Sequence, residues 1–147
     1  MNGCSAGRSS SLRYAAELIL LAPIEDVWGF VAEPYHLSDW WPGIAGVEPD
    51  RRGLAAGARW KVQGPSYFKK SETPAVLVVH EVVPIRRFAF ELLRDRLGAE
   101  LELTPEGVGR TRAVLTIEGR FLWGPRRTLG KQALRRLYDL IQTAAAL

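Results

Sequence analysis

The chain has 147 residues, of which 47% are hydrophobic and 24% are charged, and its formal net charge is +4. These values are typical of one globular domain with its own core, and they exclude a disulfide-rich scaffold and a highly charged disordered chain. The positive charge is concentrated after position 109, where eight Lys or Arg stand against two acidic residues. An excess of this size favours solubility, so no DNA contact is predicted, and contact with RNA or a membrane is the less favoured alternative.

The cysteine and hydrophobic content favour a reducing compartment. Cys4 is the one cysteine, so no internal disulfide can form, and there is no Cys/His cluster suited to zinc. No apolar run reaches the ~18 residues of a membrane span, and residues 1–11 lack the hydrophobic segment of a signal peptide. We therefore expect a cytoplasmic protein with a disordered tail over residues 1–11 and a single domain over residues 12–147.

The first third of the chain predicts a strand followed by two short helices. Leu12–Ala22 is apolar and ends before a proline, as a strand would. Apolar residues at helical spacing over Ile24–Val31 predict a helix, with two acidic residues in its first turn and Pro34 behind it. Tyr35–Trp41 predicts a second, very short helix that stops at Pro42. Neither helix is long enough to be stable alone, so both need a sheet to lie on.

From Ile44 to Gly119 the hydrophobic pattern changes to a period of two, which indicates strands. Short links rich in Gly, Pro and Asp separate them, so successive strands should pair as an antiparallel meander. The longest link lies around Pro65–Glu72. The predicted strands are Ile44–Pro49, Ala58–Gly64, Pro74–Val83, Arg87–Arg94, Ala99–Thr104 and Thr111–Gly119.

The chain closes with one long amphipathic helix, predicted over Pro125–Ala145. Leu, Ile and Ala recur at helical spacing on one face, and Arg127, Lys131 and Arg135 occupy another at intervals of four. Such a helix packs its apolar stripe on a sheet and turns its basic side to water.

Four segments in this order resemble the SRPBCC superfamily, which includes START-like, birch-pollen-allergen-like and polyketide cyclase/dehydrase proteins. They are "APIEDVWGFVAEPYHLSDWWPG" (residues 22–43), "GARW" (57–60), "VVHEVVPIRRFAFEL" (78–92) and the closing helix. The resemblance implies an α+β helix-grip fold, with a seven-stranded antiparallel sheet around the long C-terminal helix. It also implies an apolar cavity between them that holds a small hydrophobic molecule.

Alternation along the strands predicts which side chains face that cavity. Phe88 and Phe90 share a face opposite charged residues, and Val78 shares a face with His80 in its own strand. Each apolar candidate has a plain packing role in the core as its alternative. The predicted cavity-lining residues are Trp41, Trp60, Val62, Val78, His80, Phe88, Phe90, Leu101, Leu103, Leu134, Leu137, Tyr138 and Ile141.

The polar residues in that set decide between a carrier and an enzyme. An inward His80 could orient or protonate a ligand, and Tyr138 could supply a hydroxyl group. The sequence shows no nucleophile elbow, no metal-binding motif and no nucleotide-binding glycine pattern, so no cofactor and no metal are predicted. His80 and Tyr138 are therefore the candidate catalytic residues.

Three functions remain open. The leading hypothesis is a small-molecule binding protein for a lipid, a polyketide or another aromatic molecule. The first alternative is a polyketide aromatase/cyclase or dehydratase with an acid/base group in the cavity. The second is a quinone-binding or ribosome/RNA-associated protein that uses the basic closing helix. The predicted oligomeric state is a monomer or a weak homodimer.

Overall fold

The computed structural model describes residues 11–64, 75–120, 122 and 124–146. Nine residues in the first strand, β1 (Leu12–Leu20), lead into helix α1 (Ile24–Val31). A 3-10 turn, η2 (Pro34–His36), and the single-turn helix α2 (Leu37–Trp40) follow. The remaining strands are β2 (Gly46–Glu48), β3 (Arg59–Gln63), β4 (Val76–Val83), β5 (Arg87–Leu92), β6 (Leu97–Pro105) and β7 (Thr111–Gly119). A second 3-10 turn, η3 (Gly124–Thr128), precedes the long helix α3 (Leu129–Ala146).

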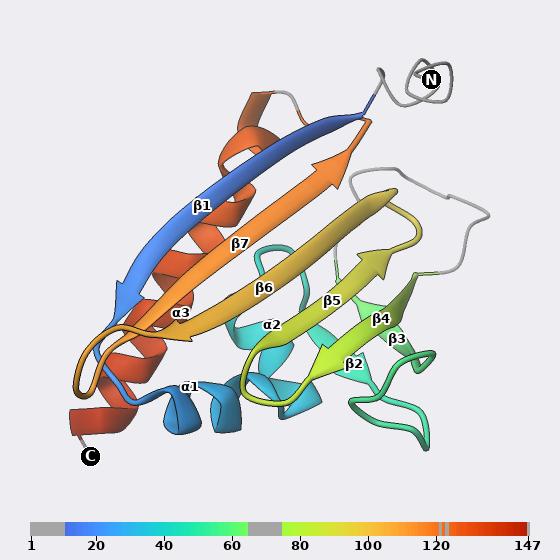
Figure 1. Ribbon diagram of the computed structural model, residues 1–147. Helices are drawn as coiled ribbons and strands as arrows, with labels where there is room; N and C mark the ends of the chain where they lie inside the picture. The colour runs from blue at the N-terminus through green and yellow to red at the C-terminus, as the bar shows by residue number, and fades with distance from the viewer. Residues whose placement is uncertain (1–10, 65–74, 121, 123, 147) are drawn as a thin grey trace, which may run out of the picture.

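The strands form one antiparallel sheet in the order β1-β7-β6-β5-β4-β3-β2. Strands β2 to β7 are a meander, and β1 joins it at β7, so β1 and β2 are the two edges. Figure 1 shows α3 running along β1 and β7, while α1 and α2 lie across one end of the sheet. The predicted seven-stranded sheet, long C-terminal helix and two short helices after the first strand are confirmed.

The core lies between the inner face of the sheet and the three helices. Alternation places one side-chain set of β5, β6 and β7 inward, and these residues are at most 5% exposed. Helix α1 contributes Ile24, Val27 and Val31, the apolar stripe that its sequence predicts. A buried hydroxyl also links two segments far apart in the chain, because Thr111 Oγ1 donates to the carbonyl of Ala22 at 2.8 Å.

Several element boundaries differ from the sequence prediction. Helix α3 begins at Leu129 instead of Pro125, because Gly124–Thr128 forms a 3-10 turn that opens at a glycine with φ of 58°. Strand β2 is limited to three residues. The link around Pro65–Glu72 and residues 1–10 of the predicted tail lie outside the described residues. No helix in the described part of the chain is both long and apolar enough to cross a membrane.

Candidate functional site

A continuous row of aromatic rings occupies the inner face of the sheet. Trp60 on β3 lies 6.0 Å from Phe88, and Phe88 lies 5.0 Å from Phe90 on the same strand, β5. Phe90 meets Trp41 edge to face at 5.2 Å, and Trp41 meets Trp40 in the same way at 5.9 Å. All five side chains are at most 1% exposed. These spacings are those of favourable aromatic pairs, so the rings fill the space between them.

The other apolar residues predicted to line the cavity are buried in the same interior. Leu101 and Leu103 come from β6, and the remaining three come from α3. They are at most 5% exposed, and they belong to the same hydrophobic cluster as the aromatic row: Leu101, Leu103, Leu134, Leu137 and Ile141. Their inward orientation is confirmed, whereas contact with a ligand stays a prediction.

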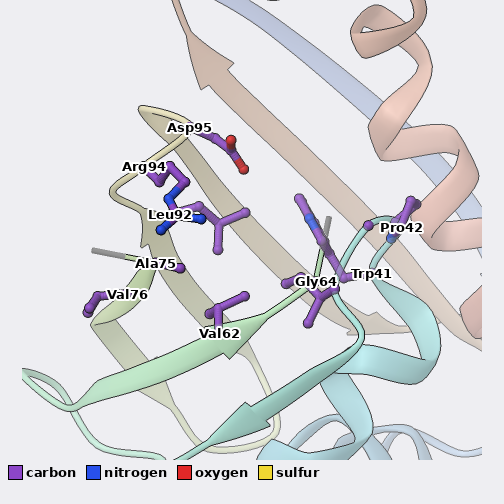
Figure 2. A pocket seen from close by; sticks show the side chains of 11 residues that line it. Trp41, Pro42, Val62, Gly64, Ala75, Val76, Leu92, Arg94 and Asp95 are labelled. Atoms are coloured by element: carbon purple, nitrogen blue, oxygen red, sulfur yellow. The ribbon is translucent and has the colours of Figure 1, made fainter. Parts of the chain in front are cut away.

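A small pocket lies beside Trp41, near one end of the aromatic row. Its volume is about 50 Å³, far below the roughly 300–1,000 Å³ of most small-molecule sites. We call it the Trp41 pocket. Its walls come from the segment after α2, from β3, from the start of β4 and from the end of β5 (Figure 2). The lining residues are Trp41, Pro42, Gly43, Ile44, Val62, Gly64, Ala75, Val76, Leu92, Arg94 and Asp95.

The turn after α2 places Trp41 in this wall. The Trp41 N–H donates to the carbonyl of Leu37 at 2.8 Å, closing the helix, and the backbone of Trp41 is already extended (φ −93°, ψ 120°). Pro42 cannot continue a helix, and Gly43 has a φ of 87°, which favours glycine. The chain therefore turns sharply, and the indole of Trp41 reaches Phe90 instead of solvent.

The polar side of the pocket is formed by the turn between β5 and β6. Arg94 and Asp95 both line it. Asp95 also forms an ion pair with Arg126 of η3 at 3.5 Å, with side chains 25% and 15% exposed. Because these two groups are largely shielded from water, their attraction is screened less than that of a surface pair. The ion pair holds the β5–β6 turn against the segment that leads into α3.

A loop beyond the far end of the row positions Trp60. The Nε1–H of Trp60 donates to the carbonyl of Gly53 at 2.8 Å. In the same loop, the Asp50 carboxylate accepts backbone N–H groups from Arg59 and Arg52, both at 3.0 Å. The Arg59 hydrogen bond is the main reason that the pKa of Asp50 is lowered from its usual value. The charged carboxylate therefore ties the loop to the first residue of β3.

This tie makes part of the stability depend on pH. The pKa of Asp50 is lower in the folded state than in the unfolded state. Its contribution to the free energy of unfolding is therefore present above the unfolded pKa of about 3.9, and it is lost as the pH falls through the folded-state pKa. We expect Asp50→Asn to reduce the free energy of unfolding at pH 6, and the difference from wild type to shrink by pH 3. Urea unfolding of wild type and variant at both pH values measures this difference in the free energy of unfolding. Glu48→Gln, an exposed change on β2, is the control, and a difference that stays constant with pH would contradict the assignment.

Comparisons with known proteins agree with this architecture. A family model described as "Polyketide cyclase / dehydrase and lipid transport" matches residues 13–144. The chain belongs to this family. No protein of curated function matches the sequence significantly. Among solved structures, a Nitrosomonas europaea protein superimposes with a TM-score of 0.68 at 19% identity, covering 95% of this chain and 99% of that one.

Two further solved structures are similar to this family member, and their names state a function. Norcoclaurine synthase of Thalictrum flavum, in complex with a transition-state analogue, has a TM-score of 0.66 at 14% identity, covering 92% of this chain and 96% of that one. The di-domain aromatase/cyclase StfQ of the steffimycin biosynthetic pathway has a TM-score of 0.70 at 11% identity, covering 97% of this chain and 54% of that one. At these identities the likeness shows the helix-grip fold alone.

The predicted inward orientation of His80 is wrong. Val79 pairs with Phe90 and Glu81 pairs with Ala89, so His80 is the extra residue of a β-bulge. Its side chain is 54% exposed on the outer face, where Nε2 lies 2.9 Å from Glu91 Oε1. His80 therefore contacts neither the aromatic row nor the Trp41 pocket, and it is removed as an acid/base candidate for this site.

The same strand explains the error for Val78. Leu77 and Val79 are fully buried, whereas Val78 is half-buried on the opposite face. Both faces of β4 carry valines, so alternation alone did not decide which face is inner. After the bulge the order reverses, and Val82 packs against the core.

Tyr138 and Val62 are placed at the margin of the interior. Tyr138 is half-buried on α3, and its hydroxyl accepts a hydrogen bond from Gln142 Nε2 at 3.2 Å. It does not line the Trp41 pocket, whereas Val62 does. The catalytic role of Tyr138 stays a prediction.

Sequence reasoning missed the polar side of the pocket, although a signal was present. The alternation that places Phe88, Phe90 and Leu92 inward continues to Arg94, two residues further on. Arg94 is the last residue of the predicted strand Arg87–Arg94, and Asp95 opens the predicted turn, so neither was considered as part of a site. The sequence gives no comparable signal for the close approach of Gly64 to the segment after α2. These two segments are distant in the sequence, and no local pattern relates them.

Proposed function

We propose that this family member binds a small hydrophobic ligand, such as a lipid, a polyketide or another aromatic molecule, at the Trp41 pocket. The observation that carries the proposal is the composition of the pocket wall. Trp41, Val62 and Leu92 form an apolar surface at the end of the aromatic row, and Arg94 and Asp95 supply charge on one side. Ligand sites typically combine a mostly apolar lining with a few placed polar groups.

This arrangement sets the orientation of the ligand. The apolar body would lie against Trp41 and Leu92, and a hydroxyl, carbonyl or carboxylate group would face Arg94. Because the pocket holds only about 50 Å³, a ligand of ordinary size requires the wall to open. Trp41 is the side chain best placed to move, since it lines the pocket and follows directly after α2.

The test measures whether filling this pocket prevents binding. We expect the purified full-length protein to bind 8-anilinonaphthalene-1-sulfonate, an aromatic anion, with an increase in dye fluorescence. Val62→Phe places a larger side chain in the pocket and should weaken dye binding at least tenfold. Val83→Phe makes the same change at a site that is 39% exposed, and it should leave the affinity unchanged. Equal affinity in both variants would overturn the proposal.

A second candidate function, cyclisation or dehydration of a bound polyketide, is supported by the Asp95 carboxyl at the pocket wall. A carboxyl group beside an apolar pocket can move protons to or from a bound substrate. Asp95→Asn should then abolish turnover of a linear aromatic polyketide substrate while dye binding persists. If wild-type protein binds such a substrate and leaves it unchanged, the protein is a carrier.

A further inference from the structure

Strand β1 is an open edge of the sheet. It spans Leu12–Leu20, contains no proline, and within the described residues it pairs with β7 alone. Alternate backbone N–H and C=O groups of an edge strand point away from the sheet, where they can pair with another chain. Proteins usually protect such edges with proline, bulges or charges along the strand. Here the strand itself carries only Arg13 and Glu17 as charged residues.

A groove runs between β1 and α3. Its main part has a volume of about 550 Å³, and its apolar surface comes from Ala16, Leu18 and Leu134. A second hollow of about 230 Å³ shares Ala16 and Lys131 with the first and extends it toward η3. Figure 1 shows α3 following β1 along this side of the molecule. The groove is therefore elongated and parallel to the strand.

The charges around the groove are unbalanced. Its rim carries four cationic side chains, and none of the four has an ion-pair partner among the described residues: Arg127, Lys131, Arg135 and Arg136. The acidic residue of the lining is Glu17, whose carboxylate already lies 3.2 Å from Arg112. Among residues 11–64, 75–120 and 124–146, nothing compensates the positive charge of the groove or pairs with the outer backbone groups of β1 beside it.

We propose that this edge binds an extended acidic peptide segment as an additional strand beside β1. Backbone groups of the peptide pair with the free edge, as in other cases of strand addition. Side chains of the added strand alternate between the two faces of the sheet. Those on the helix side meet Lys131 and Arg135. A peptide with glutamate or aspartate at every second position can therefore pair its backbone with β1 and place its negative charges beside these two cations.

The charges favour this partner over a second copy of the chain. Two β1 strands paired edge to edge about a twofold axis would place both α3 helices on the same face of the joined sheet. Lys131 and Arg135 of each copy would then lie near those of the other, and like charges at an interface oppose association. The acidic peptide instead brings opposite charge to the same residues.

The first experiment measures the role of the groove charges. The probe is a fluorescein-labelled peptide of four Glu-Val repeats, titrated with the full-length protein and followed by fluorescence anisotropy at low salt. The double variant Lys131→Glu with Arg135→Glu should weaken binding at least tenfold. The matched control, Lys61→Glu with Arg110→Glu, makes the same charge change at exposed residues outside the groove, and it should keep the affinity within about threefold, the change expected from net charge alone.

The second experiment measures the role of the backbone. An added strand donates hydrogen bonds to β1 from alternate residues only. Two peptides, N-methylated at the Glu positions or at the Val positions, should therefore differ: one loses at least tenfold in affinity and the other binds nearly as well as the unmodified peptide. Amide exchange of alternate β1 residues should slow when the unmodified peptide is bound.

Three outcomes would overturn the proposal. Equal binding of both N-methylated peptides would mean that charge alone holds the peptide. Equal affinity of the groove variant and its control would place the binding elsewhere. Binding of phosphatidylglycerol vesicles or poly(U) RNA without binding of the peptide would assign the basic face to a membrane or to RNA. Because no variant touches the Trp41 pocket, dye binding there serves as a check of folding.

Discussion

Phe90→Ala should lower the free energy of unfolding by about 3–5 kcal/mol, the usual range for a buried phenylalanine truncated in a core. Phe90 is 1% exposed and lies at the centre of the aromatic row, with Trp41 at 5.2 Å and Phe88 at 5.0 Å. Its removal leaves a cavity between Trp41, which follows α2, and Phe88 on β5. Urea unfolding followed by tryptophan fluorescence and circular dichroism measures the change.

A matched control separates packing from the loss of an aromatic ring. Tyr35 is 62% exposed, and Tyr35→Ala should change the free energy of unfolding by no more than about 0.5 kcal/mol. Phe90→Leu should fall between the two, because it restores most of the volume but not the edge-to-face contact. If Phe90→Ala instead costs as little as Tyr35→Ala, the row is not a close-packed core and the space between its rings is larger than the structure indicates.

Gly64→Ala should destabilise the fold by about 3 kcal/mol, since strained backbone and a clash act together. Gly64 follows β3 with a φ of 150°, which favours glycine. A Cβ at this position would collide with the carbonyl oxygen of Gly43 and lie 3.0 Å from the nitrogen of Ala45. The two backbones are held together there by the Ala45 N–H, which donates to the Gln63 carbonyl at 2.7 Å.

Two other glycines serve as controls for this prediction. Gly53 has a φ of 59° with no atom within 4 Å of an added Cβ, so Gly53→Ala tests backbone strain without a clash and should cost about 1 kcal/mol. Gly29 lies in α1 with open space around it, and Gly29→Ala should stabilise the protein by about 0.5–1 kcal/mol. A cost for Gly64→Ala no larger than that for Gly53→Ala would show that the two segments can separate, which would make this wall of the pocket adjustable.

Phe90 and Gly64 both affect whether the Trp41 pocket can hold a ligand. The aromatic row leaves about 50 Å³ at the Trp41 pocket, so a hydrophobic ligand must displace part of the packing that stabilises the protein. Gly64 and the segment after α2 hold the wall at which the proposed binding would begin to displace this packing. A ligand that binds the folded state will raise the free energy of unfolding by an amount that grows with the logarithm of its concentration relative to its Kd. Thermal unfolding with and without ligand therefore reports on the same residues.

Alternation predicted burial well where one face of a strand is apolar and the other charged. Phe88, Phe90, Leu101 and Leu103 are all buried as expected, because each alternates with Arg or Glu and the sheet has only one dry face. In β4 alternation could not identify the inner face, because valines occupy both faces. The pairing of Val79 with Phe90 and the bulge after it decide the orientation there, and that information lies in the neighbouring strand.

The sequence by itself determined the order of the elements, the antiparallel meander, the amphipathic closing helix and the family, because each depends on local periodicity or on the order of segments along the chain. Only the tertiary structure decided that His80 faces outward, that five aromatic rings contact one another, and that Asp95 pairs with Arg126. It also decided that the edge of β1 lies beside four cations that have no ion-pair partner within the described part of the chain. Whether inward side chains leave a cavity or fill it depends on distances between elements that are remote in sequence, and no local pattern encodes those distances.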